Sequence, residues 1–124
     1  MKTLGKTTWA IPGGHIPLRS TGHEPEFTSR DELCLLNTSD QEANVEIAIF
    51  HADREPVGSY RLKVQARRVR HIRFNDLIDP EAILLDTDYA SVIESDVPIV
   101  VQFSRLDSSQ AEKSILSTMA FPAS

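Results

Sequence analysis

Residues 60–74, YRLKVQARRVRHIRF, contain two runs of alternating apolar and polar residues that are interrupted at Arg67-Arg68. In residues 60–66 the apolar side chains stand at even numbers and basic or amide side chains stand between them, which is typical of a strand with one buried face. The alternation breaks at Arg67-Arg68 and then resumes, with Ile72 and Phe74 on one side and Val69, His71 and Arg73 on the other. We therefore predict two strand segments, joined at the arginine pair by a β-bulge or by a bend from strand to strand.

Similar short segments fill the rest of the chain. A continuous apolar run at residues 33–36 predicts a strand that is covered on both faces, and turn residues at 95–98 predict a break between two late strands. The other strands are expected at residues 7–11, 45–51, 89–93 and 99–103, and residues 115–121 fit either a final strand or a helix. Seven or eight short strands with turns every eight to twelve residues predict an all-β fold, a jelly-roll-like antiparallel β-sandwich. Strands with open edges often pair with a second copy of the chain, so we also expect an oligomer.

Length and composition indicate one ordinary globular domain over residues 1–124. The chain has 124 residues, of which 40% are hydrophobic and 25% are charged, so it is long enough for one core. The N-terminus lacks the apolar run of a signal peptide, and the longest uncharged apolar stretch, residues 97–103, is too short to cross a bilayer. The single cysteine, Cys34, cannot form an internal disulfide. These features predict a soluble protein in the cytoplasm.

Charges are separated along the chain although the net charge is only −5. Residues 60–74 hold six basic side chains and no acid, whereas residues 75–104 hold seven acids and no lysine or arginine. Blocks of opposite sign usually meet within the fold or across an oligomer interface, and we expect that here. A basic strip for an anionic partner is the less favoured interpretation, because the acidic block follows so closely.

Searches for catalytic chemistry find no motif. No two histidines alternate on one strand, so no histidine-based metal site is predicted. Cys34 lies in an apolar strand, where a thiol is usually inert packing, and the chain has neither a Gly-x-Ser-x-Gly motif nor a phosphate-binding glycine loop. We therefore expect no enzyme activity, no catalytic residue and no cofactor. Nucleic-acid binding is not favoured either, because Tyr60 and Phe74 beside the basic residues fall on the apolar phase.

Some polar or aromatic residues stand where they suit a binding pocket. His71 and Arg73 share one strand face, Gln102 interrupts an apolar strand, and Trp9 lies next to a glycine turn. Tryptophan packs against flat ligands, and the other three supply directional hydrogen bonds, which is the composition of a small-molecule site. The alternative is that Trp9 belongs to the core, Arg73 pairs with an acid and Gln102 bonds to backbone.

Nine blocks of the sequence closely resemble the sensory rhodopsin transducer family. They are residues 8–11 (TWAI), 24–27 (EPEF), 55–58 (EPVG), 60–62 (YRL), 66–68 (ARR), 73–77 (RFNDL), 90–93 (ASVI), 97–102 (VPIVVQ) and 105–108 (RLDS). Because they occur in order from Trp9 to about Ala120, chance is a poor explanation. The resemblance implies a small soluble β-sandwich that forms a homotetramer.

The resemblance also implies a function. A transducer of this kind receives a light signal on the cytoplasmic side by direct contact with a membrane-embedded sensory rhodopsin, without catalysis. The alternative is a small-molecule-binding module, carbohydrate-related in one view of the family, that has no rhodopsin partner. Candidate ligand-binding residues within the matching blocks are Trp9, Arg67, His71, Arg73, Gln102, Arg105 and Asp107. The basic strand fits a receptor-facing or a subunit-facing surface equally well.

Overall fold

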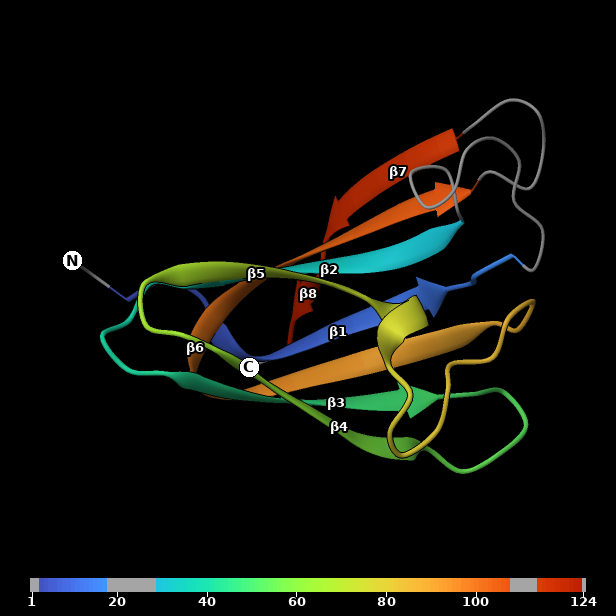
Figure 1. The fold of residues 1–124 in the computed structure, drawn as a ribbon, viewed down its shortest axis with the longest axis horizontal. Helices are drawn as coiled ribbons and strands as arrows, with labels where there is room; N and C mark the ends of the chain where they lie inside the picture. Colours follow the sequence, from blue (N-terminus) through green and yellow to red (C-terminus); the bar gives the residue numbers. More distant parts are fainter. Residues whose placement is uncertain (1–2, 18–28, 108–113, 124) are drawn as a thin grey trace.

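The chain folds into two antiparallel layers stacked face to face (Figure 1). The computed structural model describes residues 3–17, 29–107 and 114–123, and only the backbone of residues 107 and 114–119. The elements in this part are β1 (Lys6–Gly14), β2 (Arg30–Asn37), β3 (Ala43–Phe50), β4 (Val57–Val64), β5 (Arg68–Arg73), the short 3₁₀-helix η1 (Phe74–Asp76), β6 (Tyr89–Asp107), β7 (Ser114–Met119) and β8 (Phe121–Pro122). The predicted all-β sandwich is confirmed, and the tail forms strands. Within the described residues, no helix has the length and apolar character that crossing a bilayer requires.

Strand β6 belongs to both layers. Its first half pairs with β1 and β3, and its second half pairs with β2 and β7. The first layer therefore has the order β4-β3-β6-β1-β8, and the second has the order β5-β2-β6-β7.

The prediction of a turn at residues 95–98 is wrong, because the strand continues through them. Ser95 still pairs with Val45, and Asp96 accepts hydrogen bonds from the backbone N–H and the side-chain Nδ2 of Asn44, at 2.8 and 2.7 Å. Pairing with β3 thus keeps this segment extended while it passes from one layer to the other.

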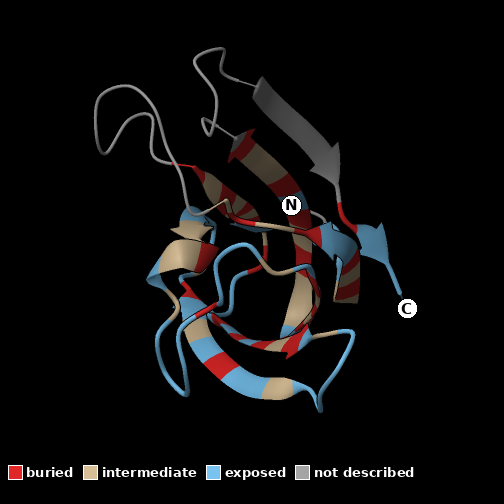
Figure 2. Cartoon of the chain, turned by 90° about the vertical axis from the view of Figure 1, so that its right-hand side faces the viewer, coloured by how far each residue is buried: buried red, intermediate tan, exposed pale blue. Residues whose placement is uncertain are grey.

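The core lies between the layers, where buried and exposed residues alternate along the strands (Figure 2). Leu33 and Leu35 of β2 and Ile47 of β3, in the opposite layer, are completely buried and belong to one core cluster. The outer face of β2 differs from the prediction, because Cys34 is only half-buried and Leu36 is exposed. The apolar run 33–36 is therefore covered on one face by this chain and not on both.

The break in the alternation at Arg67-Arg68 is the corner where the chain passes from one layer to the other. Strand β4 is the edge of the first layer and β5 is the edge of the second, so the predicted bend between strands is correct and no bulge is needed. Arg67 adopts a left-handed backbone conformation with φ of 54°, and its N–H donates to the Ser39 carbonyl oxygen at 3.1 Å. The buried side chain of Asn37 stabilises the same corner, since its Nδ2 donates hydrogen bonds to the carbonyl oxygens of residues 41, 64 and 65.

Candidate functional site

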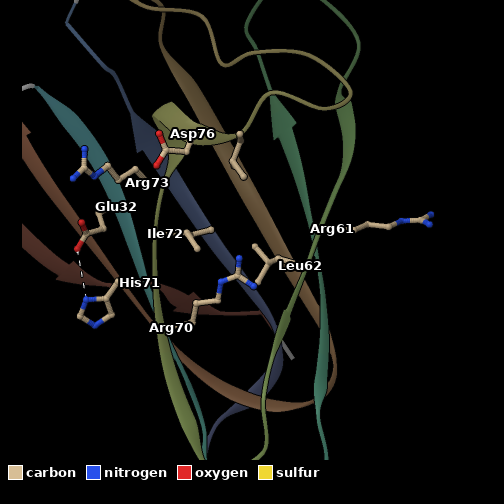
Figure 3. Close-up of a pocket in the computed structure, with 9 residues that line it drawn as sticks. Glu32, Arg61, Leu62, Arg70, His71, Ile72, Arg73 and Asp76 are labelled. Carbon is tan, nitrogen blue, oxygen red and sulfur yellow. Dashed lines mark ion pairs between the residues drawn. The ribbon is translucent and has the colours of Figure 1, made fainter. Parts of the chain in front are cut away.

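A groove opens between the edge strands β4 and β5, and we call it the β4–β5 groove. It consists of two adjoining hollows of about 480 and 540 Å³ that share Arg70. Leu62, Ile72 and Leu77 pack against the core and give the first hollow an apolar wall (Figure 3). The groove exists because the two layers have no common strand at this side.

The β4–β5 groove is lined mainly by cations. Five basic side chains face three acids, which gives a net charge of +2 with His71 neutral; the basic residues are Arg61, Lys63, Arg68, Arg70 and Arg73, and the acids are Glu32, Glu42 and Asp76. Lys63 lies 3.6 Å from Glu42, and Arg61 lies 3.2 Å from Glu46. Among the described residues, no ion pair engages Arg68, Arg70 or Arg73. Guanidinium groups beside an apolar wall suit a carboxylate or another planar anion.

Arg70 is a groove residue that was not among the predicted ligand residues. It stands opposite the buried Leu35 in the β2–β5 register, so it lies on the core-facing side of the sheet, although its side chain is exposed. Its Nη1 donates to the Lys63 carbonyl oxygen at 2.7 Å, which bridges the two layers. The sequence offers one indication of this role. Arg70 lies on the same side of the strand as Ile72 and Phe74, where an apolar residue is expected.

Three of the seven predicted ligand residues share the outer face of the second layer. His71 pairs directly with Cys34, Cys34 also pairs with Gln102, and Arg73 pairs with Glu32. His71 Nδ1 lies 3.9 Å from Glu32 Oε1. Partial burial, and then the Glu32 carboxylate, raise the pKa of the Cys34 thiol, which favours its protonated form.

The structure places Trp9 and Arg67 elsewhere. Trp9 is only 6% exposed, and its Nε1 donates to the carbonyl oxygens of Lys6 and Ile99, both at 3.0 Å. It lies in the core of the first layer and lines neither hollow of the groove. Arg67 Nη1 bonds to Asp40 Oδ1 at 2.8 Å at the crossover corner. The structure therefore does not gather the predicted residues into one pocket.

Arg105 belongs to a buried polar cluster around Asp31, which has no exposed surface. The Asp31 carboxylate accepts hydrogen bonds from Arg105 Nε at 3.1 Å, the Tyr89 hydroxyl at 2.6 Å and the His15 backbone N–H at 3.0 Å. Burial, and then the adjacent carboxylate, raise the pKa of Tyr89 far above its ordinary value of 10. Asp107 ends β6, and its side chain lies outside the described part of the chain.

The basic block does not pair with the acidic block that follows it, and this corrects the in-chain pairing that the charge pattern predicted. Among the described residues, the acids within ion-pair distance of the basic block come from β2, β3 and the turn before β3: Glu32, Asp40, Glu42 and Glu46. The reason is topological, because β4 and β5 lie beside β3 and β2. No pattern in the sequence indicated the Asp31 cluster, since Arg105 is 74 residues from Asp31 along the chain.

A family model and two solved structures are similar to this chain. The family model described as Anabaena sensory rhodopsin transducer matches residues 4–122. The solved structure of the Anabaena sensory rhodopsin transducer is 55% identical, with a TM-score of 0.76 over 83% of this chain and 99% of that chain. Thermotoga maritima protein 1070 is 29% identical, with a TM-score of 0.85 over 95% of each chain. The search of curated proteins found no significant match.

Proposed function

Because this chain belongs to the Anabaena sensory rhodopsin transducer family, we propose that it is a non-enzymatic signal transducer that meets a membrane-embedded sensory rhodopsin in the cytoplasm. The observation that carries the proposal is the high identity to a protein named for this role, over nearly the whole of that protein. A shared fold alone does not imply a shared function, whereas 55% identity is a stronger basis for inferring one. The alternative, a small-molecule-binding module, has less support. Six of the seven residues predicted to bind the ligand do not form one pocket but are divided among the core, the crossover corner, the outer face of the second layer and the Asp31 cluster.

We assign the receptor contact to the β4–β5 groove. Arg68, Arg70 and Arg73 offer guanidinium groups that are not held in ion pairs with described residues, beside an apolar wall. Carboxylates on the receptor's exposed loops or termini would complement this surface. Charge complementarity of this kind raises the association rate and excludes wrong partners.

We also propose that the working form is a homotetramer. The outer face of the second layer presents Leu36 and Val69, which are 38% and 59% exposed, and they lie next to each other in the β2–β5 register. Covering them with a second copy would remove apolar surface from water. Light scattering on the purified protein is expected to give about 56 kDa, four times the chain mass of 13.9 kDa, and a mass of one chain at micromolar concentration would exclude the tetramer.

A binding experiment with the receptor tests the function. The sensory rhodopsin encoded in the same genome is reconstituted in nanodiscs and passed over the immobilised protein, in darkness and under illumination. We expect saturable binding that weakens with salt and that differs between the two states of the receptor. A genome without a rhodopsin gene, or no binding in either state, would refute the transducer function.

Two charge-reversal variants test the surface separately. Arg70→Glu lies in the groove, whereas Arg54→Glu changes an exposed arginine that lines neither hollow. We expect the first to slow association about tenfold or more and the second to change it little. Normal binding by both variants would reject the groove as the contact but leave the function standing.

A further inference from the structure

Three side chains of different metal-ligating kinds converge on the outer face of the second layer. Glu32 and Cys34 are two residues apart on β2, so they project from the same face of the strand. His71 stands directly opposite Cys34 on β5, and directly opposite residues also share a face. The structure thus assembles a carboxylate, a thiol and an imidazole from two neighbouring strands.

The distances fit a small cation. One donor atom from each side chain lies within 4.8 Å of the other two, and His71 Nδ1 lies 3.9 Å from Glu32 Oε1. Tetrahedral zinc with bonds of about 2.0–2.3 Å separates its ligand atoms by about 3.4–3.6 Å. Side-chain rotations that close the cluster by about 1.4 Å at most therefore suffice.

The surroundings leave the ligand atoms accessible. The side chains of His71 and Glu32 are 58% and 25% exposed. Glu32 Oε2 is the oxygen that approaches Arg30, at 3.7 Å from Arg30 Nε, while Oε1 approaches His71. The two oxygens of the carboxylate thus have separate neighbours, and Oε1 can bind a cation without breaking the contact with Arg30.

We propose that Glu32, Cys34 and His71 form a Zn²⁺ site, with water in the fourth position. Sulfur and imidazole ligands select zinc over magnesium and calcium, which prefer oxygen. The thiol loses its proton to solvent when the metal binds. No metal site was predicted, because no two histidines alternate on one strand; here the ligands come from two paired strands that only the register brings together.

Cobalt and zinc binding to the full-length chain tests the site after treatment with a chelator. We expect one Co²⁺ per chain, with a thiolate-to-cobalt charge-transfer band that Zn²⁺ abolishes by displacement. Loss of an outer-sphere partner already costs about 10- to 100-fold in metal affinity, so Cys34→Ser and His71→Ala should each cost at least tenfold. His51→Ala is the matched control, because His51 is outside the cluster and should leave affinity unchanged.

A second measurement needs no variant. Cys34 is the only cysteine, so a thiol reagent reports on it alone. We expect saturating Zn²⁺ to slow its modification at least tenfold. The proposal is overturned if the charge-transfer band is absent, if Cys34→Ser binds Zn²⁺ as tightly as the unmodified protein, or if Zn²⁺ does not protect the thiol.

Discussion

Replacing Tyr89 with phenylalanine removes one hydrogen bond from the Asp31 cluster and leaves the ring in place. The Tyr89 hydroxyl donates to Asp31 Oδ2 at 2.6 Å, while its ring lies 5.3 Å from that of Phe74, measured between centroids. Tyr89 begins β6 in the first layer, and Asp31 lies on β2 in the second. The bond therefore joins the two layers at one end of the sandwich.

The magnitude follows from the charge of the acceptor. A buried hydrogen bond to a charged group contributes about 1.5–3 kcal/mol, whereas one between neutral groups contributes about 0.5–1.5 kcal/mol. Tyr60 is the control, because the residue as a whole is as buried as Tyr89, while its hydroxyl lies in a part-buried position and donates to the neutral Glu81 carbonyl oxygen at 2.5 Å. We expect Tyr89→Phe to lower the free energy of unfolding by about 2 kcal/mol, roughly twice the loss for Tyr60→Phe.

Urea unfolding followed by the fluorescence of the buried Trp9 measures both losses. The protein concentration must be the same for every variant, since subunit association adds to the apparent stability. Equal losses, or a larger loss for Tyr60→Phe, would show that Asp31 does not act as a charged acceptor for Tyr89. The account of the cluster as a charged link between the layers would then be wrong.

Two further predictions concern the ends of β1 and β3. A Cβ at Gly14 would overlap the Tyr89 ring, whereas one at Gly13 meets no atom within 4 Å. In urea unfolding, Gly14→Ala should lower the free energy of unfolding by about 1–3 kcal/mol, and Gly13→Ala should change it little. An unchanged stability of Gly14→Ala would contradict the close approach of Gly14 to Tyr89. Hydrogen bonds from Asn44 lower the pKa of Asp96 below its ordinary value of 3.8. Their contribution to the free energy of unfolding is therefore complete above pH 3.8 and is lost as the pH falls through the lowered pKa. Asn44→Ala should therefore destabilise the protein more at pH 7 than at pH 2 in thermal unfolding, and an equal effect at both would contradict this linkage.

Alternation predicted the strands well because each strand has one face in the core. Strand β3 shows it most clearly, since its odd-numbered residues from 43 to 49 are buried and the others are less so. The break in the alternation at Arg67-Arg68 was informative because it marks the corner between two strands. Both flanking strands turn an apolar side to the core, but from opposite layers.

Predictions from local residue composition were wrong where strand pairing sets the backbone conformation. Residues 95–98, Ser-Asp-Val-Pro, have the composition of a turn, yet pairing with β3 holds them extended. The opposite failure occurred at Leu36, where an apolar residue lies on an exposed face. A sequence cannot show whether a second copy covers such a face.

The candidate sites depended on strand register, which the sequence does not give. The basic character of residues 60–74 was readable, but the groove arises from the separation of β4 and β5 at the open side of the two layers. His71 could be identified as a polar residue at a strand position, whereas its pairing with Cys34 could not. A shift of one residue in that register would place the two side chains on opposite faces.

The two proposed sites are linked because Glu32 and His71 also line the β4–β5 groove. Zinc adds two positive charges, and the Cys34 thiol gives up one proton, so metal binding raises the local charge by one unit. It also removes Glu32 as a competitor for the groove's guanidinium groups, of which Arg73 is its direct partner in the register. Both effects favour an anionic partner and act within about one Debye length of the arginines, which is about 8 Å at physiological salt. Metal occupancy is therefore a means by which this chain could adjust its affinity for an acidic receptor surface without any change in its fold.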